Sequence, residues 1–344
     1  MEQTVFSSVQ VRKCWCRGCG LRFLTCAIGE TGRISVGRER NEQVKDCIYM
    51  KVGPLIYEIR SDEPFRVREE YKEFFFRNLG EIEGYAHCRR IRCEVRMVDQ
   101  FSNIEGTLVY ENPERMIFRY QNREYRLHAG QKGVCGIFRE TGEKDSFEIE
   151  LSRAEIPAFE INLLFMEMLA LEKYLLEEDA LVLHSSYIIW KGKGIAFTAP
   201  SGTGKSTQAE LWRRYAGAEI INGDRSVLWW NRETERFVLC GLPFCGSSQI
   251  NRNVSAPLLA VVLLSQAPEN HAELCPQAES IRKLFGEMSI NQWNPDMVGK
   301  SLRLIEKSAS SVPMIRLACN MEPEAVAVLQ NALKQSENRN SSVD

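Results

Sequence analysis

The segment GIAFTAPSGTGKSTQAELW, residues 194–212, constrains the fold more than any other part of this chain. It begins with an apolar run, passes through a loop that contains Gly202 and Gly204, and continues into an amphipathic run from Lys205. Glycine lets backbone N–H groups converge on an anion, and the unpaired N–H groups at the start of a helix face the same point. The segment therefore predicts a strand, a phosphate-binding loop and a helix.

The loop APSGTGKS, residues 199–206, follows the P-loop pattern except that Ala199 stands where the first glycine usually does. We predict that Lys205 binds the β- and γ-phosphates of ATP and that the Ser206 hydroxyl is a Mg²⁺ ligand. ATP and Mg²⁺ are therefore the expected cofactors. A chance match in a loop is the alternative, but the strand before and the helix after argue against it. The predicted nucleotide-binding residues are Ser201, Gly202, Thr203, Gly204, Lys205, Ser206 and Thr207.

Two further residues are candidates for the chemistry. Asp224 follows Lys205 by 19 residues, which is enough for one helix and one return strand. We therefore expect Asp224 at the carboxyl end of a strand next to the P-loop strand, where it would bind Mg²⁺ or accept a proton. The alternative is a solvated turn, because Asn-Gly-Asp is also good turn chemistry. His184 precedes the adjacent apolar run, and a lone histidine is more often structural than catalytic, so both roles stay open.

Composition narrows the function classes. The 344 residues carry 44 Lys plus Arg and 46 Asp plus Glu, a net charge of −2, which argues against nucleic acid or a membrane surface as a partner. The sequence contains no run of about 18 uncharged apolar residues and no apolar core of a signal peptide near its start. These features predict a cytoplasmic protein, in which the 12 cysteines are mostly free thiols.

One group of cysteines stands apart near the start of the sequence. Cys14, Cys16 and Cys19, with Cys26 further on, could hold a structural zinc, although the spacing lacks the two separated pairs of a specific zinc motif. The alternative is that residues 1–49 lie outside the native core and that the ordered chain starts at Met50.

The remaining sequence divides into two predicted domains. Residues 50–155 alternate between apolar and polar side chains, as in RIRCEVRMV, which predicts a β-rich, mostly antiparallel domain. Residues 156–335 predict an α/β nucleotide-binding domain that opens with one helix in EINLLFMEMLALEKYLLEE. Hairpin turns are expected at Gln121-Asn122 and at 191–193. Residues 336–344 are expected to be a disordered tail.

Residues 181–333 resemble the HPr serine kinase/phosphorylases and their relatives, which share a P-loop core with ATP-dependent phosphoenolpyruvate carboxykinases. The segments LHSSYIIWKGKGIAFTAPSGTGKST and EIINGDRSVL carry the resemblance, together with GLPFCGSSQINRNVSAPLLAVVLL and VPMIRLACNMEPEAVAVL. The resemblance implies an α/β fold with a P-loop HPr kinase/PEP carboxykinase-like C-terminal domain, preceded here by the β-rich N-terminal domain.

The resemblance also implies an ATP-dependent kinase that acts on a serine hydroxyl. By position, His184 would approach the transferring phosphate, Asp224 would be the base or metal ligand, and Arg252 would help to neutralise the phosphoryl group. In two respects the chain departs from the family. Gly223 replaces the first of two adjacent aspartates, which puts phosphorylase activity in doubt, and the N-terminal domain is different, which favours an acceptor other than HPr.

These observations predict a kinase that transfers the γ-phosphate to a hydroxyl on a peptide, protein or small molecule. The alternatives are a catalytically weak ATP-binding regulator of the same fold, favoured by Gly223, and a true HPr kinase. A carboxykinase-type decarboxylation would need metal and carboxylate-binding residues that the sequence does not offer. A homo-oligomer is compatible with these features.

Overall fold

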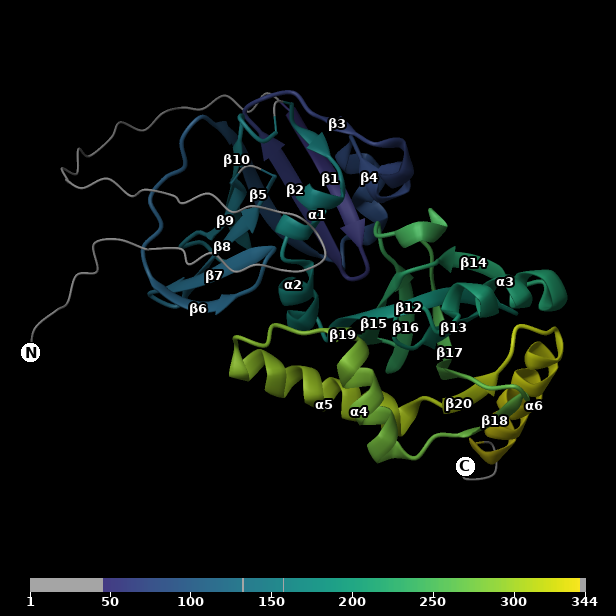
Figure 1. Cartoon of the computed structure of the whole chain (residues 1–344). Helices are drawn as coiled ribbons and strands as arrows, with labels where there is room; N and C mark the ends of the chain where they lie inside the picture. Colours follow the sequence, from purple (N-terminus) through teal and green to yellow (C-terminus); the bar gives the residue numbers. More distant parts are fainter. Residues whose placement is uncertain (1–45, 132, 157, 341–344) are drawn as a thin grey trace, which may run out of the picture. The chain divides into compact units, whose positions relative to one another are not determined.

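The computed structural model describes residues 46–131, 133–156 and 158–340 (Figure 1). The predicted zinc cluster at Cys14, Cys16 and Cys19, like Cys26, lies outside these residues. The first described strand begins at Asp46, four residues before Met50. The described residues form two compact units. One comprises 46–47, 59–66 and 92–161, and the other comprises 48–58, 67–91 and 162–340.

The first unit is built almost entirely from strands. Its main sheet has the order β5-β10-β9-β8-β7-β6, and a second sheet pairs β11 with β3. All strand pairs of the main sheet are antiparallel except β5 with β10. The strands are β3 (Arg66–Val67), β5 (Arg89–Val98), β6 (Thr107–Glu111), β7 (Arg115–Tyr120), β8 (Arg123–Ala129), β9 (Val134–Glu140), β10 (Ser146–Ser152) and β11 (Glu160–Ile161).

The apolar residues that alternate with polar ones in strand β5 of this unit are the buried residues of that strand. Cys93, Val95 and Met97 of β5 are each at most 4% exposed, whereas the residues between them are less buried. The turn between β7 and β8 consists of Gln121 and Asn122, whose φ angles of 47° and 63° give the left-handed turn of a two-residue hairpin. The predicted hairpin and the mostly antiparallel pairing are confirmed.

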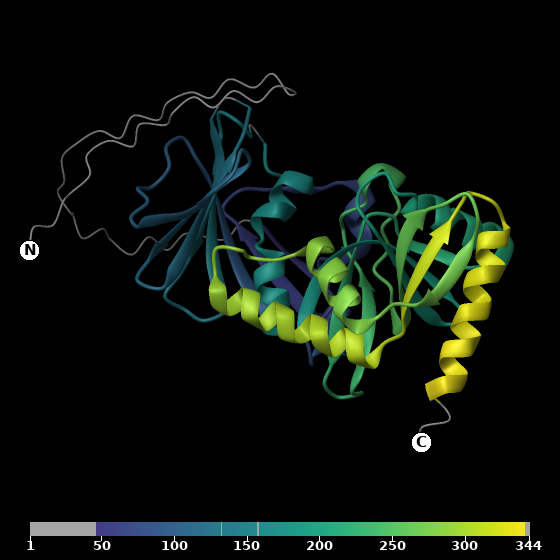
Figure 2. The same cartoon turned by 60° about the horizontal axis from the view of Figure 1, so that its bottom comes forward.

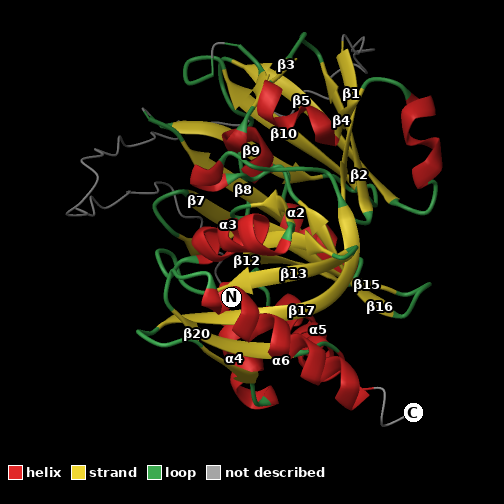
Figure 3. Ribbon diagram, turned by 90° about the vertical axis from the view of Figure 1, so that its right-hand side faces the viewer, coloured by secondary structure: helices red, strands yellow, loops and turns green. Residues whose placement is uncertain are grey.

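The second unit contains the predicted phosphate-binding loop. Its central sheet has the order β14-β12-β13-β17-β20-β18, in which β13, β17 and β20 are parallel to one another (Figure 3). The long strands β12 and β17 also pair with β15 and β16 in an antiparallel layer, and β19 adds to β12. The strands are β12 (Ala180–Trp190), β13 (Lys193–Thr198), β14 (Glu219–Asn222), β15 (Arg225–Asn231), β16 (Arg236–Gly241), β17 (Ser255–Gln266), β18 (His271–Leu274), β19 (Met288–Ser289) and β20 (Met314–Cys319).

Helices cover both faces of the central sheet. On one face α3 and α6 bury Trp212 and Leu329 against Phe197 and Ile315, and on the other α4 and α5 bury Leu284 and Ile305 (Figure 2). Alternate residues of the buried strands supply the two cores, which explains their continuous apolar runs. The helices are α1 (Leu163–Met168), α2 (Leu171–Glu177), α3 (Lys205–Ala216), α4 (Gln277–Glu287), α5 (Pro295–Ser311) and α6 (Glu324–Asn340).

Two predictions about helices are wrong. The single helix expected over residues 160–178 is two short helices, α1 and α2, because Ala170 between them has a left-handed φ of 51°. Residues 336–340 belong to helix α6 instead of a disordered tail, and Ser336 is buried with its hydroxyl donating to the Leu333 carbonyl. Among the described helices, none has the length and apolar character that crossing a membrane requires.

The units are discontinuous in sequence, whereas the sequence pattern predicts a single boundary near residue 155. Strands β1 (Asp46–Val52), β2 (Leu55–Ser61) and β4 (Phe75–Phe76) lie mostly in the second unit. The reason is visible at Gly53, where an added Cβ would lie 3.5 Å from Val227 and 3.8 Å from both Cys240 and Leu175. Long-range packing therefore assigns this early hairpin to the second unit, and no local pattern in the sequence encodes that packing.

Candidate active site

The predicted phosphate-binding loop lies between β13 and α3, so the expected order of strand, loop and helix is observed. Gly202 and Gly204 have φ angles of 80° and 112°, which glycine adopts without the steric cost that other residues incur. Helix α3 begins at Lys205 directly after the loop. Backbone N–H groups from the loop and from the first turn of the helix are thus available to one anion. Ser201 and Gly202 are exposed, so the loop is open to a ligand.

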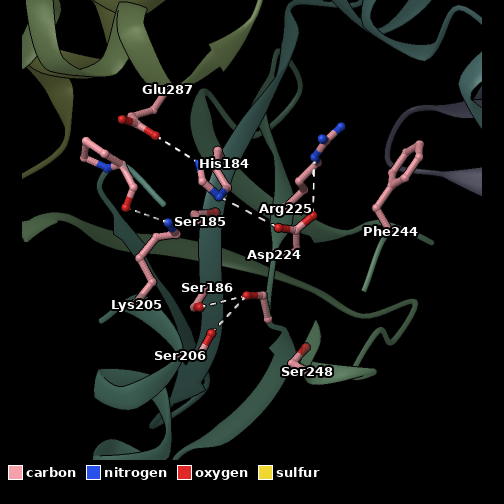
Figure 4. Close-up of polar contacts among 12 residues, drawn as sticks. His184, Ser185, Ser186, Lys205, Ser206, Asp224, Arg225, Phe244, Ser248 and Glu287 are labelled. Carbon is pink, nitrogen blue, oxygen red and sulfur yellow. Dashed lines mark hydrogen bonds and ion pairs between the residues drawn. The ribbon is translucent and has the colours of Figure 1, made fainter. Parts of the chain in front are cut away.

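Lys205, the predicted phosphate ligand, is buried. Its side chain turns back over the loop, and its ammonium donates to the carbonyl oxygens of Ala199 (2.8 Å) and Pro200 (3.3 Å) (Figure 4). Burial lowers the pKa of Lys205, and the negative charges of Glu287 and Asp224 oppose that shift. The lysine is therefore held at the loop by neutral carbonyls in a site that also contains two carboxylates.

Asp224 lies at the same edge of the sheet as the loop, but through a different topology from the one predicted. Its strand, β14, pairs with β12 and is not a neighbour of β13, because the hairpin strand β12 lies between them. β14 and β13 both run antiparallel to β12, so their carboxyl ends still coincide. The Ser206 hydroxyl reaches the carbonyl of Gly223 at 3.5 Å, and the Ser186 hydroxyl donates to the same carbonyl at 3.1 Å.

His184 lies in β12 between two carboxylates. Its Nδ1 is 3.0 Å from Glu287 Oε2, and its Nε2 is 3.8 Å from Asp224 Oδ1 (Figure 4). An ionised carboxylate only accepts hydrogen bonds, so the Glu287 contact places a proton on Nδ1 and turns Nε2 towards Asp224. The imidazole is thereby oriented within the site. The structure brings His184, Lys205, Ser206 and Asp224 together, as the sequence predicts.

Arg252 is the predicted residue that the structure does not bring into this cluster. Its guanidinium forms ion pairs with Glu219, at the amino end of β14, and with Glu73. Arg225 occupies the position beside the acid instead: its Nε is 3.4 Å from Asp224 Oδ2, and its guanidinium lies 5.3 Å from the centre of the Phe244 ring. The adjacent positions of 224 and 225 in sequence were a signal for this pairing.

The structure gives a steric reason for the glycine that precedes Asp224. A Cβ added to Gly223 would lie 2.0 Å from Ser248 Oγ and 2.4 Å from Ser248 Cβ. A side chain at position 223, including a second aspartate, has no room while Ser248 is in this position. Ser248 and Glu287 were both missed from the sequence, and neither carries a local motif that could have revealed it.

The oxygen donors at this site fit Mg²⁺, a hard cation that prefers carboxylate, hydroxyl and phosphate oxygens. Ser206 and Asp224 are the side chains that would hold it. The Ser206 hydroxyl reaches the Gly223 carbonyl, and Asp224 follows Gly223 in the sequence. Within the described part of the chain, no group of three or more His, Cys, Asp or Glu side chains could hold a metal. A cation here would accordingly depend on phosphate oxygens for most of its ligands.

No family model and no curated protein matches this sequence. Among solved structures, the chain is similar to the Hpr(Ser) kinase/phosphatase from Coxiella burnetii, with 13% identity and a TM-score of 0.27. The match covers 47% of this chain and 95% of that chain. At this TM-score no common fold is demonstrated, and the function proposed below rests on the site's own geometry.

Proposed function

We propose that this chain is an ATP-dependent kinase that transfers the γ-phosphoryl group to a serine-type hydroxyl on a peptide, protein or small molecule. The observation that carries the proposal is the meeting of two segments at the Gly223 carbonyl. Ser206, from the phosphate-binding loop, contacts this carbonyl, and Asp224 is the next residue along the chain. A phosphate ligand and a carboxylate that could receive a proton would therefore be neighbours.

Each residue has a role that follows from its chemistry. The backbone N–H groups of 202 and 204–206 would donate to phosphate oxygens, whereas the Thr203 N–H already donates to the Pro200 carbonyl. The Lys205 ammonium would supply positive charge. Bound Mg²⁺ would neutralise phosphate charge, with Ser206 and Asp224 as the residues that hold it. Asp224 would also accept the proton of the attacking hydroxyl.

Two neighbours would support Asp224. His184, oriented by Glu287, directs its Nε2 at the Asp224 carboxyl, where it would accept a hydrogen bond once Asp224 has taken up the proton. Arg225 adds a second positive charge beside the developing charge of the transferred group. In this proposal Arg225 takes the role that the family resemblance would give to Arg252.

One observation favours a second candidate, a catalytically weak ATP-binding regulator of the same fold. Only one acid stands at the end of β14, and Ser248 occupies the space of the other. A carboxylate that holds the metal and also receives the proton is a weaker base than one free of the metal, which would make transfer slow. The regulator would bind ATP as tightly as the kinase but would not transfer phosphate.

The test separates nucleotide binding from phosphoryl transfer. Asp224→Asn keeps the size and a carbonyl oxygen but removes the charge and basicity, so transfer should fall by about 10²–10⁴-fold. ATP affinity should fall much less, because Lys205 and the loop N–H groups remain. Transfer is measured with γ-labelled ATP and Mg²⁺ against peptide, free serine and water, and affinity by calorimetry.

Lys205→Ala should weaken ATP binding by roughly 10- to 100-fold, the loss expected for a hydrogen bond to a charged group. Lys193→Ala is the matched control, since Lys193 is half-exposed and pairs with Glu337. An unchanged ATP affinity in folded Lys205→Ala would sink the proposal. An Asp224→Asn variant that transfers at the parental rate would leave the base role unsupported.

A further inference from the structure

The loop between β16 and β17 places Ser248 against Gly223, the residue that precedes the proposed base. Its 3₁₀ turn, Gly246–Ser248, packs directly on the end of β14. Ser248 Oγ lies 2.0 Å from the position of a Cβ at residue 223, and a Cβ added to Gly246 would lie 2.8 Å from the Asp224 Cβ. Both contacts leave no space for a side chain at position 223 or 246.

A buried amide fixes this loop to the acid. Asn222 is fully buried, and its Nδ2 donates to the carbonyls of Leu242 (2.7 Å) and Phe244 (2.8 Å) in the loop. Its Oδ1 accepts from the backbone N–H groups of Asp224 (2.8 Å) and Arg225 (2.9 Å). One side chain therefore holds both segments, and the separation of Ser248 from Asp224 is set by a buried hydrogen-bond network.

The phosphate-binding loop is the third member of this arrangement. Gly223 contacts Ser248 on one side, and its carbonyl accepts from Ser206 on another. Ser248 is thus separated from the start of helix α3 by the backbone of a single residue. Its hydroxyl donates to the Cys245 carbonyl at 2.7 Å and accepts from the Ile250 N–H at 3.2 Å. Rotation about one side-chain bond would redirect it and would break both hydrogen bonds.

We propose that Ser248 is a modification site that the chain phosphorylates by itself, within one molecule. The inference rests on the proposed kinase function. A bond forms between Ser248 Oγ and the γ-phosphorus of ATP, and the bond from that phosphorus to the β,γ-bridging oxygen breaks. The hydroxyl proton passes to Asp224, and ADP leaves. Arg225, on the other side of Asp224 and stacked on Phe244 of the same loop, is the cation that pairs with the new phosphate.

The experiment incubates the purified full chain with ATP and Mg²⁺ and follows intact mass, with the site located by fragment mass spectrometry. We expect one added phosphoryl group on Ser248, at a first-order rate that does not change with protein concentration. Ser248→Ala should abolish the modification and Ser247→Ala should retain it. In Asp224→Asn the rate should fall by about 10²–10⁴-fold.

Calorimetric ATP binding and transfer of labelled phosphate to external acceptors are measured in parallel. If ATP binds and phosphate reaches an external acceptor while Ser248 stays unmodified, this inference is overturned and the kinase proposal stands. If the folded chain does not bind ATP, both are overturned. Phosphate on Ser247, or a rate that rises with protein concentration, would also overturn the assignment to Ser248 within one molecule.

Discussion

At the scale of single residues, His184 depends on Glu287 for its orientation. Glu287→Gln keeps an acceptor oxygen but replaces a charged hydrogen bond by a neutral one, a difference of about 1 kcal/mol. We expect phosphoryl transfer to fall on the order of 5- to 10-fold, with ATP affinity unchanged, in single-turnover assays. Glu279→Gln is the control on the same helix, because Glu279 pairs with Lys283 and Arg316. Equal rates in the two variants would contradict the orienting role.

The two arginines make opposite predictions. Arg225 lies beside Asp224, so Arg225→Ala should lower the transfer rate by roughly 10- to 100-fold, as expected for the loss of a charged contact. Arg252 pairs with Glu219 and Glu73 at the surface, so Arg252→Ala should change the free energy of unfolding by about 1 kcal/mol or less. Transfer rates and urea unfolding of both variants show which arginine supports phosphoryl transfer and which one contributes only to stability. A larger loss of transfer in Arg252→Ala would restore the role implied by the family resemblance.

At the scale of elements, the end of β14 and the turn Gly246–Ser248 compete for one space. Gly223→Ala would place a Cβ 2.0 Å from Ser248 Oγ, so we expect it to displace the turn and lower the free energy of unfolding by about 1–3 kcal/mol. Ser248→Gly removes both clashing atoms, and the double variant should recover most of that loss. Gly84→Ala, which has open space around it, is the control. Additive effects in the double variant would show that the turn is not held by this contact.

At the scale of the whole molecule, a buried histidine should make the first unit sensitive to acid. Burial, reinforced by the positive charges of Arg126 and Arg115, lowers the pKa of His128 to about 3. An unfolded histidine has a pKa near 6.5, so below that pH the unfolded state binds the extra proton and stability falls as the pH falls towards 3. The slope for this one group is at most about 1.4 kcal/mol per pH unit.

The measurement compares the free energy of unfolding at several pH values from about 7 to about 4, which covers most of the interval between the unfolded pKa and the folded pKa of about 3. His128→Gln carries no titrating group and should flatten the dependence, whereas exposed His87→Gln should leave it unchanged. The same slope in His128→Gln as in the parent chain would mean that other groups govern acid unfolding.

The sequence by itself determined the features that depend on neighbouring residues. Positive φ at Gly202 and Gly204 follows from the glycines themselves. Helix α3 ends before Gly217, whose φ of 66° is the left-handed conformation that glycine adopts at helix ends. The hairpin between β12 and β13 turns at Lys191 and Gly192, which both have positive φ angles. Two such residues make the short turn of a two-residue hairpin. The loop, the helix and the hairpin were predictable because turn and helix signals act over a few residues.

Tertiary structure decided what lies around that loop. His184 and Glu287 meet although 103 residues separate them, and Ser248 fills the space beside Gly223 because Asn222 ties its loop to β14. The resemblance pointed to Arg252, but ion pairs with Glu219 and Glu73 hold its guanidinium away from Asp224, and only Arg225 remains beside the acid. These contacts arise from packing between distant segments. The side chains that would assist the chemistry were therefore set by the fold, while the conformation of the predicted phosphate-binding loop was set by its own residues.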